Sequence, residues 1–67
     1  MSDELIIEIK GSTEKNNFEI LNALGQIVFK SNFIEKTTIQ TRNFIPGVYF
    51  VKLENSQTFE IKKVVKE

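Results

Sequence analysis

The sequence has no cysteine, histidine or tryptophan, and only one proline, one alanine and one aspartate among its 67 residues. Without cysteine it can form neither a disulfide nor a thiolate metal site. Without histidine, Ser12, Ser31 and Ser56 lack the usual base that activates a serine nucleophile. The near absence of alanine, the best helix former, disfavours helices. The sequence therefore predicts a protein that is not an enzyme, with no catalytic residue, no metal ligand and no cofactor.

Charge of neither sign dominates the chain. Nine basic and nine acidic residues give a net charge of zero, which disfavours nucleic acid and anionic membranes as partners. No apolar run approaches the roughly 20 residues of a spanning helix, so no direct membrane insertion is expected. Residues 1–4 read as the start of a product or the edge of an excised piece. Because the amino end lacks a signal-peptide pattern, an exported form would take its export signal from a longer precursor.

The apolar residues that are present favour strands. Nine Ile, five Val, six Phe and one Tyr suit pleated, half-buried surfaces. Their runs predict strands over residues 5–10, 18–21, 26–30, 37–40, 48–53 and 58–65. Six strands at roughly 8–12-residue spacing predict an all-β fold, a small antiparallel immunoglobulin-like β-sandwich. A chain of this length is one domain, so residues 1–67 are expected to form a single β-sandwich.

Turn chemistry separates these strands. Gly25 ends a tight turn that begins at Asn22, and a glycine there is free to take a positive φ. Pro46 and Gly47 predict a second turn, since proline presets φ for its first central position. Residues 31–36 are expected to form a loop in which Phe33 or Ile34 caps the core, and residues 54–57 to connect the last hairpin.

Tyr49, two residues after Gly47, has two interpretations. It is a corner tyrosine with a buried ring and a hydroxyl bonded to a backbone carbonyl, or an exposed aromatic that stacks on sugars. No tryptophan supports a sugar platform, so the structural role is favoured.

Alternation within the strands predicts which side chains form the core. Truncating one of them should cost about 2–5 kcal/mol, so Phe59→Ala or Leu53→Ala is expected to unfold most of the protein. The predicted buried set is Ile7, Ile9, Phe18, Ile20, Ile27, Phe29, Ile39, Tyr49, Val51, Leu53, Phe59 and Ile61.

Two groups of polar residues resemble functional sites, a carboxylate pair and a calcium loop, but surface roles are favoured for both. Glu54 and Glu60 could meet across the last hairpin as paired carboxylates, but solvated surface charges are the favoured interpretation. Glu14, Asn16 and Asn17 read as a polar turn, because a calcium loop needs clustered aspartates.

The end of the chain has the only concentrated charge of one sign, on Lys62, Lys63 and Lys66. One interpretation is a solvated edge strand whose charges discourage edge-to-edge pairing. The other is a handle that a receptor recognises by strand addition or carboxylate capture. In both, Val64 and Val65 complete the hydrophobic seam while the three lysines stay in water or face the receptor.

The order of these parts resembles the type A C-terminal sorting domain carried by cargo of the Bacteroidetes type IX secretion system. That pattern has a hydrophobic strand, a strand ending in an N-x-x-G turn, a return strand, a Thr-rich strand, a P-G-x-Y crossover and a closing K-x-V-V-K-like strand. Here these parts fall, in order, on residues 7–9, 18–25, 26–30, 37–40, 46–49 and 62–66. The family's usual Tyr-Pro-Asn-Pro-like opening and first strand do not precede Leu5, which suggests an excised or truncated domain, or a stand-alone product.

The resemblance implies a secretion signal at the carboxyl terminus of its cargo. Its partners would be secretion-system proteins and a sortase-like cysteine protease that removes it. It would be exported, pass through the periplasm and reach the outer membrane, the cell surface or the extracellular space, where such cargo is often anchored to lipopolysaccharide. Recognition would fall on Lys62, Lys63, Val64, Val65 and Lys66, while Gly25, Pro46, Gly47 and Tyr49 are structural.

Two further expectations accompany this interpretation. The alternative function on the same fold is an immunoglobulin-like adhesion or carbohydrate-associated module. A missing first strand would also leave a sheet edge uncovered, so we expect a homodimer through that open edge, or through a swapped strand.

Overall fold

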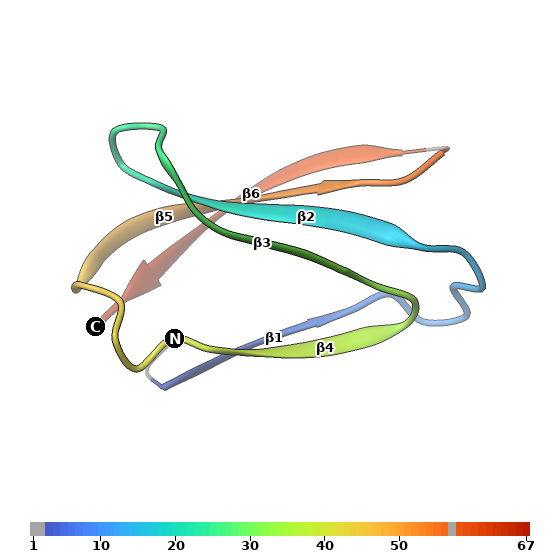
Figure 1. Cartoon of the computed structure of the whole chain (residues 1–67), viewed down its shortest axis with the longest axis horizontal. Helices are drawn as coiled ribbons and strands as arrows, with labels where there is room; N and C mark the ends of the chain where they lie inside the picture. The colour runs from blue at the N-terminus through green and yellow to red at the C-terminus, as the bar shows by residue number, and fades with distance from the viewer. Residues whose placement is uncertain (1–2, 57) are drawn as a thin grey trace.

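Six antiparallel strands form two facing sheets in the computed structural model, which describes residues 3–56 and 58–67 (Figure 1). Met1 and Ser2, from the expected amino-terminal edge, and Gln57, from the expected hairpin connection, lie outside the described residues. The four-stranded sheet has the order β3-β2-β5-β6 and the two-stranded sheet pairs β1 with β4. The strands are β1 (Glu4–Glu8), β2 (Asn16–Asn22), β3 (Ile27–Phe33), β4 (Lys36–Gln40), β5 (Gly47–Glu54) and β6 (Phe59–Lys66). The predicted all-β sandwich is confirmed.

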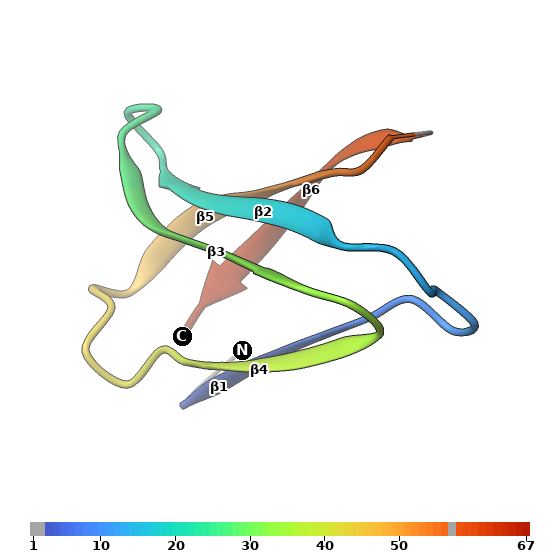
Figure 2. The ribbon, with the colours of Figure 1, turned by 45° about the vertical axis from the view of Figure 1, so that its right-hand side comes forward.

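The core lies between the two layers, where Figures 1 and 2 show the small sheet under the larger one. Phe18 is at its centre, with ring centroids 5.9 Å from Phe29 and 5.8 Å from Phe33. Such tilted and edge-on aromatic pairs add to the stabilisation from burial. The buried hydrophobic residues are Phe18, Ile20, Phe33, Ile39, Tyr49 and Val51.

The predicted core is right for the centre of the sandwich and wrong at its margins. Phe18, Ile20, Ile39, Tyr49 and Val51 are buried as predicted. The half-buried members of the predicted set are Ile7, Ile9 and Leu53. The predicted set also contains four exposed residues, Ile27, Phe29, Phe59 and Ile61.

Two of these errors arise on β3, the edge strand next to β2. A register shift between Ile20 and Leu21 places Ile27 opposite Leu21, on the outer side of the sheet. Phe29 does face inward opposite Ile20, but an edge strand has a neighbour on one side only, and 39% of Phe29 stays exposed. A bulge and an edge position therefore remove two residues that alternation alone assigns to the core.

The predicted loop over residues 31–36 is also wrong, because β3 continues to Phe33 and β4 begins at Lys36. Ser31 and Asn32 pair with Phe18 and Asn17 of β2, so the ladder extends through residues that resemble a turn signal. The remaining connection is two residues long. Of the two candidates for capping the core, the structure buries Phe33 and exposes Ile34.

Candidate functional site at the carboxyl-terminal strand

β6 forms one edge of the four-stranded sheet (Figure 2). It pairs with β5 along its whole length, from Phe59 opposite Glu54 to Lys66 opposite Gly47. Among the described residues, no strand pairs with its other edge. Along residues 59–63 the backbone N–H and C=O groups on that side are therefore available to another strand.

The inner face of β6 carries more charge than the sequence pattern predicts. Strand pairing places Glu60 beside Leu53, Lys62 beside Val51 and Val64 beside Tyr49. These β6 residues line a groove of about 260 Å³ that lies between β6 and β1, with Val51 and Leu53 also lining it. Glu60 and Lys62 are exposed at its rim, whereas Val64 is half-buried.

The outer face of β6 carries Phe59, Ile61, Lys63 and Val65, which corrects the predicted orientation of Phe59 and Ile61. Their exposed fractions are 54% and 58%. The doublet Lys62-Lys63 interrupts the alternation, so both faces of β6 carry apolar residues, Phe59, Ile61 and Val65 on one face and Val64 on the other. The pairing with β5 then decides which set faces inward.

Lys66 is the second correction on this strand. We expected it in water, but its exposed fraction is 7%, while Val65, expected in the hydrophobic seam, is 49% exposed. Lys66 has the same parity as Val64 and therefore faces inward, opposite Gly47, which has no side chain to compete for the space. The long apolar stem of lysine can cover such a surface. Lys66 is therefore part of the packing rather than of an exposed handle.

Glu54 and Glu60 do not form a pair of carboxylates. Glu54 lies opposite Phe59 and Glu60 lies opposite Leu53, so the two side chains are on opposite faces of the sheet. Lys62 and Lys63 likewise point to opposite faces, and both are exposed. The candidate recognition residues thus separate into two accessible lysines, one exposed valine and two residues that hold β6 to the sandwich.

An apolar surface continues from β6 across the outer side of the sheet. We define this outer patch by Leu21, Ile27, Phe50, Phe59 and Ile61, of which all but Ile27 line one concavity. The ammonium of Lys52 lies 5.4 Å from the centroid of the Phe59 ring and 3.8 Å from Oε1 of Glu19. A lysine over an aromatic face is attracted by the ring quadrupole, so Lys52 contributes a cation–π contact to this patch.

The turn between β2 and β3 has the predicted residues in place. Gly25 has a φ of 84°, which side chains rarely adopt. Its N–H donates to the carbonyl of Asn22 at 2.9 Å. Oδ1 of Asn22 accepts from the N–H groups of Leu24 and Gln26, at 2.9 and 3.0 Å. The asparagine side chain therefore closes the turn from within.

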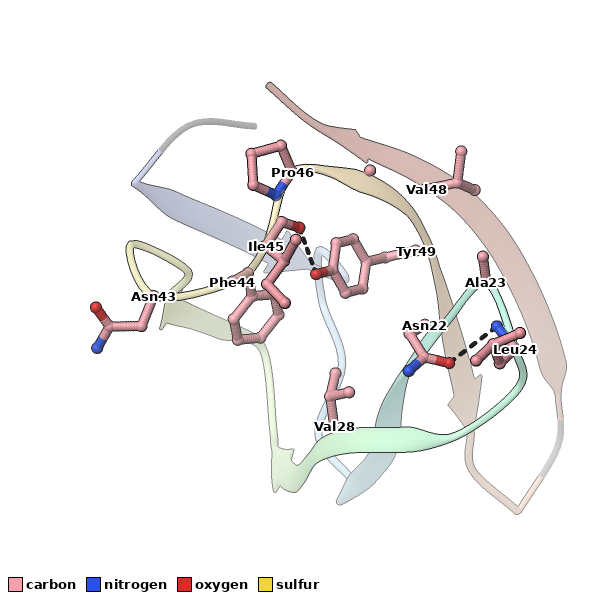
Figure 3. Close-up of a pocket in the computed structure, with 11 residues that line it drawn as sticks. Asn22, Ala23, Leu24, Val28, Asn43, Phe44, Ile45, Pro46, Val48 and Tyr49 are labelled. Carbon is pink, nitrogen blue, oxygen red and sulfur yellow. Dashed lines mark hydrogen bonds between the residues drawn. The ribbon is translucent and has the colours of Figure 1, made fainter.

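The Pro46-Gly47 turn lies at the same end of the sandwich, beside the β2–β3 turn (Figure 3). The hydroxyl of Tyr49 donates to the carbonyl of Ile45 at 2.5 Å, and the Phe44 ring centroid lies 5.3 Å from that of Tyr49. Tyr49 is buried and Gly47 has a φ of 151°. This is the geometry of a corner tyrosine, and the burial of the ring does not suit a sugar platform.

Sequence reasoning missed a fully buried polar residue on β2. Asn16 is 0% exposed, and its side chain bonds to Ser12, Glu14, Ile34 and Asn55. No feature of the run Asn16-Asn17 distinguishes the buried asparagine from its exposed neighbour. The one available signal is that Asn16 lies two residues before the inward-facing Phe18, and therefore on the same face of the strand.

The described residues offer an accessible strand edge and an exposed apolar patch. They contain no group of three or more His, Cys, Asp or Glu residues that could hold a metal ion. In the part of the chain that the structure describes, no helix is long and apolar enough to cross a membrane. What the arrangement provides is a folded sandwich with an accessible terminal strand.

The comparison with protein families agrees with this arrangement. The family model described as a secretion system C-terminal sorting domain matches residues 1–67, the whole chain. No match to a curated protein was found. The family match confirms the resemblance and supports the sorting function over the adhesion or carbohydrate-associated module. The chain therefore belongs to the C-terminal sorting domains, the signals that direct proteins through the type IX secretion system and across the outer membrane.

Proposed function

We propose that the secretion machinery recognises this domain through β6, by adding an extended segment of a receptor along its free edge. The outer edge of β6 along residues 59–63 carries this proposal, because no described strand pairs with it and such an edge accepts another strand. Lys62 and Lys63, exposed on opposite faces, would contact acidic groups on either side of the added strand. Val64 and Lys66 would keep β6 in place from the inner face.

We further propose that recognition occurs during passage through the periplasm and that a sortase-like cysteine protease then removes the domain. The family resemblance supports this step, and no residue of this chain is assigned to it. The domain would be the substrate of that protease and would take no catalytic part, as expected for a sorting signal.

The test places this chain behind a passenger that carries an export signal, in a type IX-competent host. The intact domain should bring the passenger to the cell surface. Deleting residues 62–67 should strand it in the periplasm, because the deletion removes five of the eight residues of β6. Lys62→Gln with Lys63→Gln should reduce surface delivery partly if the machinery binds the charges.

The matched control is Lys30→Gln with Lys36→Gln, two exposed lysines on β3 and β4. This control should be delivered like the intact domain. Protease resistance of the purified variants separates loss of recognition from loss of folding. Surface delivery of the 62–67 deletion at the level of the intact domain would refute recognition through β6.

A further inference from the structure

We infer that, when no receptor is bound, the free edge of β6 pairs antiparallel with β6 of a second copy of this chain, centred on Ile61. The inference deepens the proposed use of this edge and rests on its being accessible. It names the partner, the register and the residues that select them. The evidence is the order of charges along β6.

When a two-fold axis relates two antiparallel copies of a strand, one central residue lies opposite its own copy. A residue a given number of positions before the centre then lies opposite the residue the same number of positions after it. The inner faces of the two strands then lie on the same side, as do the outer faces, because the two residues of each pair are both even-numbered or both odd-numbered. The possible registers of β6 therefore differ only in the central residue.

Most of these registers place like charges directly opposite each other, which destabilises a pair. Centring on Glu60, Lys62 or Lys63 puts that residue opposite its own copy. Centring on Val64 puts Lys62 opposite Lys66. Centring on Phe59 or Val65, near the ends of the strand, leaves a ladder of three residues or fewer within β6.

Centring on Ile61 has no like-charge pair. Glu60 then lies opposite Lys62 of the second copy, and the symmetry repeats this pair. Neither residue forms an ion pair with another described residue of its own chain, so both are free to pair between copies. Phe59 lies opposite Lys63, again twice, and an aromatic ring beside a lysine is favourable.

Apolar surface supports the same register. Ile61 is 58% exposed and lies opposite its own copy, and Phe59 is 54% exposed. Pairing would join the outer patches of two copies across the axis into one apolar face. Exposed apolar surface of this kind marks interaction sites. Lysines on an edge strand usually prevent pairing, but here Glu60 permits it in one register.

Pairing covers the same backbone groups that a receptor strand would use. The homodimer and the receptor-bound form therefore exclude each other, and a paired domain is withheld from recognition until the copies separate.

Charge reversal tests the pairing in the purified 67-residue chain by sedimentation equilibrium. Glu60→Lys gives two Lys–Lys contacts and Lys62→Glu gives two Glu–Glu contacts, so each variant should self-associate at least tenfold more weakly. An equimolar mixture restores both opposite-charge pairs and should form a heterodimer. The controls, Glu54→Lys and Lys30→Glu, reverse exposed charges elsewhere and should associate like the unchanged chain.

Cysteine substitution gives a second measurement that depends on register alone, since the chain has no cysteine of its own. Under mild oxidation, Ile61→Cys should form the disulfide-linked dimer fastest, and Glu60→Cys and Lys63→Cys more slowly. A strict monomer up to millimolar concentration, unchanged association of both charge variants, or fastest linkage at another position would overturn the inference. Association is measured without the secretion machinery, so its failure is separable from a failure of sorting.

Discussion

The side-chain amide of Asn55 donates a 2.7 Å hydrogen bond to Oδ1 of Asn16, joining the β5–β6 turn to the first residue of β2. The amide nitrogen of Asn16 donates to the carbonyl of Ile34 at 2.7 Å and to Oγ of Ser12 at 3.0 Å. One buried side chain thus connects three turns that are distant in sequence. Leaving those groups unpaired in a dry interior would be costly.

Removing this connection should destabilise the domain. We expect Asn16→Ala to lower the free energy of unfolding by about 1–3 kcal/mol, the cost of leaving buried polar groups unsatisfied. Asn17→Ala, one residue along and exposed, should change it by less than about 0.5 kcal/mol. Urea denaturation measures both. Equal effects at the two positions would contradict the buried network.

Phe18 and Phe59 should respond differently to truncation. Phe18 is 1% exposed and Phe59 is 54% exposed. Phe18→Ala should cost about 3–5 kcal/mol, most of the stability of so small a domain. Phe59→Ala should leave a cooperative transition, contrary to the expectation from alternation. Thermal unfolding followed by circular dichroism distinguishes them, and unfolding of the Phe59 variant would reverse our assignment of the β6 faces.

Gly25 should tolerate asparagine better than alanine. Its φ of 84° lies in the left-handed region, where a Cβ costs about 1–2 kcal/mol. The surrounding space is open, since a Cβ built at Gly25 would meet nothing within 4 Å, so the cost is backbone strain alone. Asparagine visits this region more readily. The midpoint of urea unfolding should fall in the order glycine, asparagine, alanine, and any other order would refute the strain.

The hydroxyl of Tyr49 should contribute a measurable part of the stability. Tyr49→Phe removes the bond to the carbonyl of Ile45 and keeps the ring beside Phe44, so it should cost about 0.5–1.5 kcal/mol. For a domain of this size each kcal/mol lowers the melting temperature by about 4–8 °C. An unchanged melting temperature would show that the corner bond is dispensable.

Lys66 and Lys63 provide a test of packing against charge. Lys66 is buried and Lys63 is exposed, on the same strand and with the same side chain. Lys66→Ala should therefore destabilise the domain more than Lys63→Ala, which should stay within about 0.5 kcal/mol. Denaturant titration of the two variants makes the comparison, and a larger loss at Lys63 would contradict the inward orientation of Lys66.

Except for the loop expected over residues 31–36, the strands and turns of this fold were predictable because their signals are local. Val48 to Leu53 form a run rich in aromatic and β-branched residues after a Pro-Gly turn, and Gly25 closes a turn whose geometry needs few distant contacts. The sorting function was predictable from the order of these elements, which the whole-chain family match confirms.

The faces of β6 were not predictable because they depend on a partner strand. Both parities of β6 contain apolar residues, Phe59 and Ile61 on one and Val64 on the other. The pairing of Tyr49 with Val64 decides between them, and this pairing is a long-range contact. The burial of Asn16 depends in the same way on connections more than ten residues distant. Sequence periodicity does not determine the faces of β6, and for Asn16 it gives a side of the strand but not the hydrogen-bond partners that allow its burial.

The beginning of β1 and the end of β6 lie at the same end of the sandwich, as Figures 1 and 2 show. Asp3 is bonded to Thr41, and the crossover that follows leads to Gly47, the partner of Lys66. A force that cargo exerts ahead of β1 would therefore act close to the place where a receptor would bind β6. A pulling force between these two points would first separate Lys66 from Gly47, and then separate the remaining β5–β6 residue pairs one at a time.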